Sequence, residues 1–260
     1  MKICTLYSGS RGNSIFISAG GKNILIDAGK SSVRLCSALN EIGVSPADID
    51  AVFITHEHSD HTSALDVFLK KNKIPVHMIN ASASRLLSMG IDHLNENIVT
   101  HPPLYSVELD GVTVSSFETP HDSLSSVGYR ISFFENGIKK EIGIATDIGH
   151  VSECVLTGLL GCESVIVESN HDIEMLKNGR YPADLKKRIL SKRGHLSNKD
   201  CGVLVSKLIE NKTKNILLAH LSEENNAPDI AYDEIAGIIA GRDVRLEVAD
   251  PVYITKLIWE

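Results

Sequence analysis

Residues 55–61 read THEHSDH and directly follow the apolar run AVFI. The stretch crowds imidazoles and carboxylates together: its candidate ligands are His56, His58, Asp60 and His61. Desolvating such groups without partners costs free energy, so a strong cation is expected among them. Three histidines and an aspartate at this spacing seldom serve packing alone, and the stretch therefore predicts a metal site.

The position of the stretch indicates how several ligands would converge. The strand candidate AVFIT ends where the polar cluster begins, and a helix candidate follows it. Because alternate residues of extended chain share a face, His56 and His58 should point the same way. Asp60 and His61 would lie in the first turn of the helix, behind a cap near Ser59.

One turn cannot complete a coordination sphere, so the sequence should supply later ligands. His121, Asp147 and His220 each follow an apolar strand candidate. Open α/β sheets tend to place sites at the C-terminal ends of strands. Taken singly, each of the three is as consistent with an ordinary hydrogen-bonded role. Four other histidines are interpreted as surface or hydrogen-bonded residues: His77, His93, His101 and His150.

The composition is that of a globular protein. The chain has 260 residues, 43% hydrophobic and 23% charged, and we expect one domain over residues 1–260. The N-terminal stretch MKICTLYSGS holds no apolar run long enough for a signal peptide, and no run approaches the roughly 18 apolar residues of a membrane helix, so we expect a soluble, cytoplasmic protein. A net charge of −7 argues against a histone-like basic surface but leaves local basic patches open. The five cysteines form no CxxC pair, so we expect buried thiols and no thiolate zinc site.

Short β-branched runs alternate with helical patterns along the chain. The tight turns SGSRGNS and AGGKN join the first three strand candidates, which predicts an antiparallel meander. Helices beside both hairpins and crossovers predict sheets covered by helices on their outer faces. The helix candidates are residues 31–42, 60–71, 81–88, 151–160, 182–192, 198–210 and 229–240. The strand candidates are KICTL, SIFIS, NILID, AVFIT, IPVHMI, VTVSSF, VGYRISFF, EIGIAT, SVIVES, NILLAH, VRLEVA and VYITKL.

The HxHxDH pattern, the strand NILIDAG ending in Asp27, and the later His, Asp and His at strand ends resemble the metallo-β-lactamase superfamily. The resemblance covers nearly the whole chain in the right order. It implies a four-layer αββα sandwich with a dinuclear site along one edge. It also implies that Asp27 holds the ligand loop in place.

The resemblance further implies a ligand set for two divalent metal ions, zinc or manganese. One ion would be held by His56, His58 and His121. The other would be held by Asp60, His61 and His220, with Asp147 bridging the two.

Three departures narrow the subfamily. True β-lactamases have a cysteine ligand where this chain has Asp147, so antibiotic hydrolysis is not expected. Flavodiiron members replace the second histidine by glutamate, whereas His58 stands here. The β-CASP nucleases carry a large inserted domain, and the segment between Asp147 and His220 is too short for one.

Two further stretches resemble the phosphodiesterase branch of the superfamily, which includes ribonuclease Z. They are ESNHD (168–172) and RYPADLKKRILSKRGHLSNKD (180–200). Together with SGSRGNS they resemble the YycJ/WalJ group of bacterial proteins, described as metal-dependent hydrolases with DNA exonuclease activity. The resemblance implies an exonuclease that acts on the DNA backbone, with a place in DNA repair.

A phosphodiester resists attack and has a poor leaving group, and two ions about 3.5–4 Å apart answer both problems. A hydroxide bridging the ions would attack phosphorus, with Asp60 and Asp147 acting directly at the centre. His195 would be the general acid, because the matching histidine of the branch assists the leaving oxygen. Gly194 would let substrate approach closely. The alternative is that His195 only caps the helix that begins near Ser197.

For several other residues the sequence is consistent with either a substrate-binding or a structural role. Asn170 and His171 could touch substrate or order the ligands, and a structural role for His171 is equally open. Lys187 and Arg188 belong to a basic run that could hold a nucleic acid backbone or be a solvated helix face. Arg11 is a possible phosphate contact. Two other functions also stay open, a small-molecule (cyclic) phosphodiesterase or other hydrolase of this fold, and a non-catalytic metal-stabilised binding module. Oligomeric state is not predicted.

Overall fold

The first three strands form the antiparallel meander that the tight turns predict. In the computed structural model, which describes residues 1–259, β1 (Lys2–Tyr7) pairs with β2 (Ser14–Ala19), and β2 pairs with β3 (Lys22–Ile26). The chain divides into two compact units. Unit 1 comprises Met1–Tyr105, Ser123–Ser125 and the residues from Asp250, whereas unit 2 comprises Ser106–Asp122 and Ser126–Ala249. The single domain expected over residues 1–260 stays a prediction.

Unit 1 is built on a seven-stranded sheet of order β14-β1-β2-β3-β4-β5-β6. Pairing is antiparallel from β14 to β3 and parallel from β3 to β6. Its remaining strands are β4 (Ala51–Phe53), β5 (Val76–Ile79), β6 (Ile98–His101) and β14 (Thr255–Trp259). Its helices are α1 (Ser32–Glu41), α2 (Ser59–Thr62), α3 (Leu65–Lys71) and α4 (Asn80–Ser88), with 3-10 turns η1 (Pro46–Asp48) and η2 (Asp92–Leu94). Helices α1, α3 and α4 pack their apolar residues against one face of the sheet.

The helix predicted at residues 60–71 is two helices, α2 and α3, and hydrogen bonds from elsewhere explain the break. In a continuous helix the amide of Ala64 would donate to the carbonyl of Asp60. Here Ala64 N donates to Ala28 O (2.9 Å), and Asp60 O accepts from Asn13 N (2.7 Å). The turn that carries the candidate ligands is therefore fixed by two other loops of unit 1.

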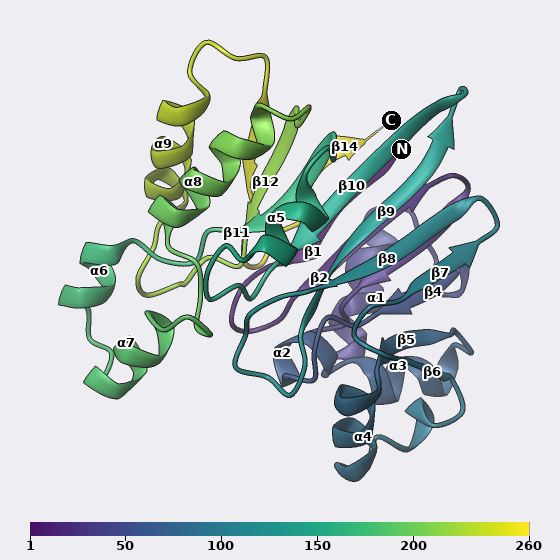
Figure 1. Ribbon diagram of the computed structural model, residues 1–260. Helices are drawn as coiled ribbons and strands as arrows, with labels where there is room; N and C mark the ends of the chain where they lie inside the picture. The colour runs from purple at the N-terminus through teal and green to yellow at the C-terminus, as the bar shows by residue number, and fades with distance from the viewer. Residues whose placement is uncertain (260) are drawn as a thin grey trace. The chain divides into compact units, whose positions relative to one another are not determined.

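Unit 2 is built on a second seven-stranded sheet, of order β13-β12-β11-β10-β9-β8-β7. Pairing is antiparallel from β7 to β10 and parallel from β10 to β13. Its strands are β7 (Ser106–Leu109), β8 (Val112–Glu118), β9 (Val127–Glu135), β10 (Ile138–Ala145), β11 (Ser164–Glu168), β12 (Asn215–Ala219) and β13 (Arg245–Val248). Its helices are α5 (Glu153–Leu159), α6 (Ile173–Asn178), α7 (Ala183–Ile189), α8 (Asn198–Ile209) and α9 (Pro228–Ile239). Helices α5, α8 and α9 pack on this sheet, with α8 and α9 side by side (Figure 1).

The strand directions decide where polar side chains gather in each unit. Strands β10, β11 and β12 are parallel, and β8 runs in the same direction because two antiparallel pairings separate it from β10. Their C-terminal ends therefore share one edge of the second sheet. In the first sheet β3 and β4 are parallel and likewise end at one edge.

Several elements differ from those predicted from the sequence. The short edge strands β6 and β7 were not predicted, nor was α6, a short helix capped by Asp172. Pro182 is the N-cap of α7, not its first helical residue. The cysteines are free, as expected, but Cys154 is exposed and Cys36 half-buried. Within residues 1–259, no helix has the length and apolarity that crossing a membrane requires.

Candidate metal centre

The THEHSDH turn of unit 1 presents its side chains where β4 ends and α2 begins. His58 is the N-cap of α2, which places Asp60 and His61 in the helix's first turn. His56 and His61 are fully buried, and their ring centroids lie 4.2 Å apart. The His56 and His58 ring centroids lie 4.5 Å apart. Several potential metal ligands thus lie within one short turn.

Asp27, at the end of β3, holds this turn in place. Its carboxylate accepts hydrogen bonds from Thr55 N (2.8 Å), from the Thr55 hydroxyl (2.9 Å) and from His61 Nδ1 (2.7 Å). Burial raises the pKa of Asp27, while His61 and Thr55 oppose that rise. The carboxylate therefore fixes both the start of the turn and one of its imidazoles.

Two contributors to this turn escaped the sequence analysis. The Thr55 hydroxyl donates to Asp27, so its lone pairs are left to accept from His56 Nδ1 (3.0 Å). Asn13 Nδ2 lies 3.2 Å from Asp60 Oδ2 and 3.1 Å from His61 Nε2. Asn13 belongs to the SGSRGNS turn, for which a hairpin role was the minimum expectation.

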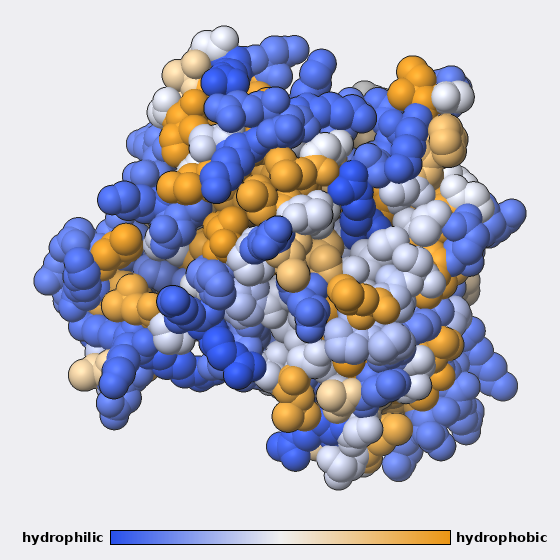
Figure 2. All heavy atoms as spheres, in the orientation of Figure 1, coloured by the Kyte–Doolittle hydropathy of each residue, from blue (hydrophilic) through white to orange (hydrophobic). Residues whose placement is uncertain are grey.

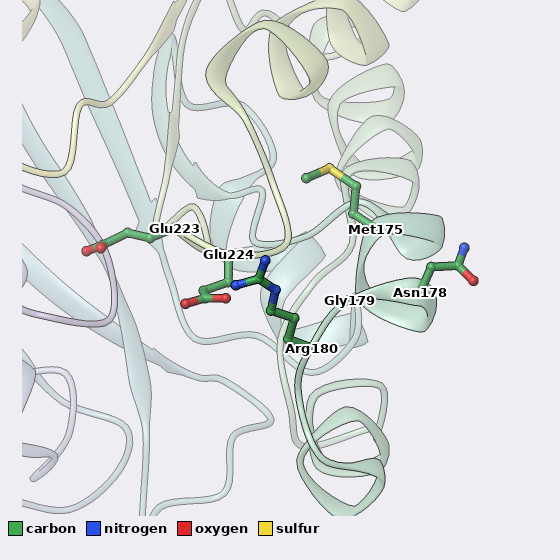
Figure 3. Close-up of a pocket in the computed structure, with 6 residues that line it drawn as sticks. All are labelled: Met175, Asn178, Gly179, Arg180, Glu223 and Glu224. Atoms are coloured by element: carbon green, nitrogen blue, oxygen red, sulfur yellow. The ribbon is translucent and has the colours of Figure 1, made fainter.

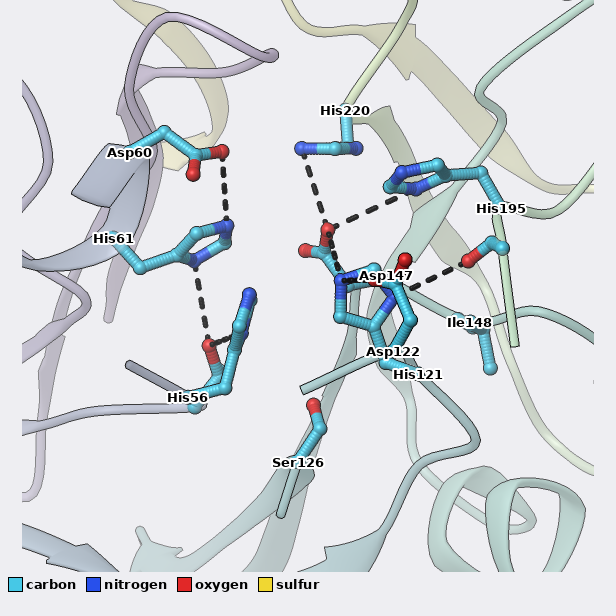
Figure 4. Close-up of polar contacts among 12 residues, drawn as sticks. His56, Asp60, His61, His121, Asp122, Ser126, Asp147, Ile148, His195 and His220 are labelled. Atoms are coloured by element: carbon cyan, nitrogen blue, oxygen red, sulfur yellow. Dashed lines mark hydrogen bonds and ion pairs between the residues drawn. The ribbon is translucent and has the colours of Figure 1, made fainter. Parts of the chain in front are cut away.

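Unit 2 gathers three histidines around Asp147, which follows β10. Asp147 Oδ1 lies 3.5 Å from His220 Nε2, 3.7 Å from His121 Nε2 and 3.8 Å from His195 Nδ1 (Figure 4). Asp147 and His220 have positive φ angles of 57° and 58°. Non-glycine residues rarely adopt this conformation outside functional or turn positions, and here it turns both side chains into the cluster.

Glu168 is the residue of unit 2 that the sequence analysis missed. It is fully buried at the end of β11. Its Oε1 accepts from His195 Nδ1 (2.7 Å) and His220 Nδ1 (3.1 Å). Its Oε2 accepts from the backbone amides of Ile148 (2.6 Å) and Leu196 (3.1 Å).

The four contacts define what Glu168 does. Burial alone would raise the pKa of this carboxyl, but His195 and His220 hold it well below its usual range. An ionised carboxylate only accepts hydrogen bonds, so both histidines must donate from Nδ1. Although Asp147, Glu168, His195 and His220 each offer an atom within 4.8 Å of the others, both oxygens of Glu168 are already occupied. Glu168 therefore positions the two imidazoles and is not itself a ligand.

Four candidate histidine ligands have the same pattern of hydrogen bonding. This pattern indicates whether the residues could hold a metal ion. Each has an acceptor at Nδ1, which leaves Nε2 as the atom for coordination. The four contacts are His56 to Thr55 Oγ1 (3.0 Å), His61 to Asp27 Oδ2 (2.7 Å), His121 to Gly194 O (3.2 Å) and His220 to Glu168 Oε1 (3.1 Å). Metal-binding histidines characteristically donate their other ring N–H in this way. The donor set of imidazoles and carboxylates thus fits a divalent metal.

His195 lies in the loop between α7 and α8. Burial lowers its pKa, but the Glu168 carboxylate outweighs burial and raises the pKa overall. It does not cap α8, because Ser197 does, accepting from Asp200 N (3.1 Å). The role expected of Gly194 was wrong: a side chain there would lie 2.1 Å from Ile189 O, so the space beside it is filled by α7.

Asn170 and His171 follow β11 and are both buried. Asn170 Nδ2 donates to the backbone oxygen of His220 (2.8 Å), so it fixes the segment that carries this histidine. His171 Nδ1 lies 3.4 Å from Asn170 Oδ1, and its Nε2 has no hydrogen-bond partner within residues 1–259. Burial lowers the pKa of His171. These contacts favour a supporting role for Asn170.

Some residues of the basic run before His195 have polar partners within the protein and others do not. Arg188 Nε forms an ion pair with Asp122, and Arg193 Nε donates to the backbone oxygen of His121 (2.8 Å). Lys187 is exposed and has no polar partner in the described part of the chain. Arg188 therefore ties α7 to the His121 loop, whereas Lys187 is available to a ligand.

The histidines interpreted as hydrogen-bonded residues are confirmed as such. His77 Nδ1 lies 3.0 Å from His101 Nε2, and His77 also stacks on Phe53. His93 Nδ1 lies 2.9 Å from Asp66 Oδ1, and His150 Nδ1 donates to Lys192 O (2.9 Å).

Comparison with known proteins places the chain. A family model described as metallo-beta-lactamase superfamily matches residues 7–132. The chain is 33% identical to "Exodeoxyribonuclease YycJ" of Bacillus anthracis over 97% of this chain and 96% of that protein. It is 34% identical to "Exodeoxyribonuclease WalJ" of Streptococcus pneumoniae serotype 2, over 98% and 94% respectively. The crystal structure of the metallo-beta-lactamase fold protein YhfI from Bacillus subtilis superposes with a TM-score of 0.71 at 15% identity, covering 100% of this chain and 99% of that one.

The chain belongs to the metallo-β-lactamase superfamily of hydrolases, and the predicted fold class is confirmed. Within that superfamily its full-length similarity is to the YycJ and WalJ proteins, as the motifs indicate.

Proposed function

We propose that the chain is a metal-dependent phosphodiesterase that digests DNA from a strand end. The observation that carries the proposal is the pair of His195 and Glu168 beside Asp147. The alkoxide that leaves a phosphodiester needs a proton, and a positioned acid typically contributes about 10²–10⁴-fold. The names of the two relatives that match over nearly their whole length support DNA as the substrate.

The proposal includes two divalent ions, zinc or manganese. The ligands for one would be His56, His58 and His121, those for the other Asp60, His61 and His220, and Asp147 would serve both. When bound, such ions supply an activated water and neutralise phosphate charge. The occupied Nδ1 atoms of four of these histidines support the assignment.

The chain's own residues divide the remaining work. His195 would donate the proton from Nε2, since Nδ1 is held by Glu168. Before the transfer, the buried Glu168 carboxylate stabilises the charged form of the His195 ring. During the transfer it keeps the ring oriented. Asp60 and Asp147, the carboxylates expected at the centre, are oriented respectively by Asn13 and by the backbone turn at positive φ.

A basic segment supports a polyanionic substrate. Residues 173–193 contain seven basic and two acidic side chains, a net charge of +5 within a chain of net charge −7. In Figure 2 the surface over α6 and α7 is predominantly hydrophilic. Lys187 and Lys192 are exposed, and we assign them to phosphate contacts that do not read sequence.

The first test combines elemental analysis with digestion of end-labelled single- and double-stranded DNA in manganese, zinc and magnesium. We expect bound metal and stepwise shortening from one end. His195→Ala should lower the rate about 10²–10⁴-fold with metal content unchanged. Absence of digestion with every metal would contradict the proposal, and an unaltered His195→Ala rate would contradict the role of the acid.

The second test separates DNA from a small phosphodiester as substrate. Lys187→Glu combined with Lys192→Glu should weaken DNA cleavage and spare a small chromogenic phosphodiester, because only the polymer reaches both lysines. Lys207→Glu, exposed on α8, is the matched control. Equal losses on both substrates would favour the small-molecule phosphodiesterase.

A further inference from the structure

A pocket of about 510 Å³ lies where the C-terminal end of α6 meets the loop after β12. The residues that line it all belong to unit 2, and the proposed hydrolysis uses none of them. They are Met175, Asn178, Gly179, Arg180, Glu223 and Glu224 (Figure 3).

The walls of this pocket are fixed by the backbone. A side chain at Gly179 would lie 2.5 Å from Asn225 Oδ1, so the two segments are in close contact there. The loop after β12 is tied down by Asp172 N donating to Asn225 O (2.9 Å) and by Ser222 N donating to Asn170 O (2.8 Å). The backbone beneath the pocket is therefore ordered before any ligand arrives, which lowers that part of the entropic cost of binding.

The charges of the lining select the chemistry of the occupant. The lining carries two carboxylates, Glu223 and Glu224, and one guanidinium, Arg180, so a phosphate group is disfavoured inside. Arg180 and Glu224 are exposed, and neither has a polar partner within residues 1–259. A neutral group with N–H donors and flat faces suits this lining, since carboxylates accept and a guanidinium plane stacks.

Met175 supplies the apolar contact that such a flat group needs. It is half-buried, and a thioether makes favourable contacts with aromatic rings. Figure 3 shows Arg180 extending from its loop toward the segment that carries Glu224. A ring between them would meet a sulfur, a cation and an acceptor at once.

The pocket is also close to the proposed centre along the chain. Glu223 and Glu224 follow His220 by three and four residues. Even fully extended, that chain spans only about 11–14 Å between Cα atoms. A strand cleaved beside His220 would bring a neighbouring nucleotide to the pocket.

We propose that this pocket binds a nucleobase of the DNA strand, one or two nucleotides from the phosphate that is cleaved. The inference rests on the proposed function and adds a base preference to it. Glu224 accepts from the amino group of adenine, cytosine or guanine, and Arg180 stacks on the ring. Thymine, which lacks an amino group, binds less well.

The test uses oligo(dT) strands that carry one dA, dC, dG or abasic residue at each of the first four positions from the digested end. Wild-type kcat/KM should be about threefold to tenfold higher for an amino-bearing base than for dT at one position only. Glu224→Gln should remove that preference, because an amide can also donate to the oxygen of thymine. Glu210→Gln, exposed at the end of α8, is the matched control.

A binding measurement in chelator separates this inference from the nuclease proposal. Strands with 2-aminopurine at the same position should change fluorescence on binding wild-type protein, and Glu224→Gln should lose the change. Digestion with equal kcat/KM for every base and for abasic strands would overturn the pocket and leave the nuclease standing. Fluorescence lost in Glu224→Gln without digestion of any strand would overturn the nuclease and support the pocket. If neither the base preference nor the fluorescence change is observed and no strand is digested, both proposals are overturned.

Discussion

Each unit contains an Asp-x-Gly turn at the end of the strand that begins the parallel part of its sheet. In unit 1 the turn is residues 27–29 after β3, and in unit 2 it is residues 147–149 after β10. Asp27 and Asp147 have nearly equal positive φ angles, 63° and 57°. Each glycine lies against the backbone of another segment: a side chain at Gly29 would be 2.0 Å from Asp60 O in α2, and one at Gly149 would be 2.3 Å from Lys192 O.

The two aspartates differ in which atom of an imidazole they meet. Asp27 accepts from Nδ1 of His61, whereas Asp147 lies near Nε2 of His121 and of His220. The Nδ1 atom of His195 is also near Asp147, at 3.8 Å, but its hydrogen bond is to Glu168. A carboxylate at Nδ1 orients a ring, and one among Nε2 atoms can share a metal with it. Under the proposed metal assignment, the same backbone turn would orient a ring in unit 1 and present a metal ligand in unit 2.

The sharpest test of that difference is Asp147→Asn. Asparagine tolerates positive φ, so the backbone should be kept while the shared charge is removed. We expect DNA cleavage to fall on the order of 10³-fold or more, with reduced metal content by elemental analysis. Full activity with normal metal content would place Asp147 among the supporting residues, like Asp27.

The two glycines test the backbone that the turns share. Gly29→Ala and Gly149→Ala should each lower the free energy of unfolding by about 3 kcal/mol, because the methyl group meets backbone that cannot move cheaply. Urea unfolding measures the effect. A loss below about 1 kcal/mol at either site would mean that the facing loop is free to shift.

One histidine from each unit extends the comparison to pKa values. His195, beside Glu168, has a raised pKa, whereas burial next to His101 lowers the pKa of His77 to about 4. The folded state thus favours neutral His77, so its stabilisation is complete above pH 6.5 and is lost as the pH falls toward 4.

We expect this histidine to account for about 2–3 kcal/mol of the acid destabilisation between pH 7 and pH 4. Urea unfolding in chelator should show a shallower pH dependence for His77→Gln than for wild type. His150→Gln, at an exposed position, is the control and should keep the wild-type slope. Equal slopes for all three proteins would show that His77 titrates normally.

Asp27→Asn is the partner of the Asp147 variant and should have the smaller effect. The asparagine side chain can still accept a hydrogen bond from Thr55 N. It lacks the negative charge that orients His61 through Nδ1. Changes to groups that orient metal ligands typically cost about 10–100-fold in affinity or activity. Metal titration followed by DNA digestion checks this, and a loss as large as that of Asp147→Asn would erase the distinction drawn between the turns.

The smallest predicted effect is an increase in stability. Gly237 lies in α9 with open space at its Cβ position, so Gly237→Ala should stabilise the protein by about 0.5–1 kcal/mol through helix propensity. Thermal unfolding of Gly237→Ala, Gly29→Ala and Gly149→Ala should be measured under the same conditions. The comparison shows whether crowding at the Cβ position explains the difference in their effects on stability. Destabilisation by Gly237→Ala would argue against that explanation.

The sequence predicted most of the sheet strands and the ligand-rich turn because their signals are local. Alternating apolar runs and the crowded THEHSDH stretch can be read without knowing the fold. Glu168 could not be recognised, because it ends an apolar strand and its partners lie 27 and 52 residues away. The break after α2 was missed for the same reason, since Ala28 and Asn13 supply its hydrogen bonds.

Asp27, Asp147 and His220 all sit in the left-handed region of backbone conformation. In a library that samples every amino acid at these positions, two kinds of loss would therefore be mixed. Variants with valine or isoleucine would lose activity because these residues disfavour positive φ. Variants with glycine or asparagine tolerate that backbone and would report only on the loss of the native side chain. A screen that counts only active variants would therefore overstate the contribution of these three side chains to catalysis.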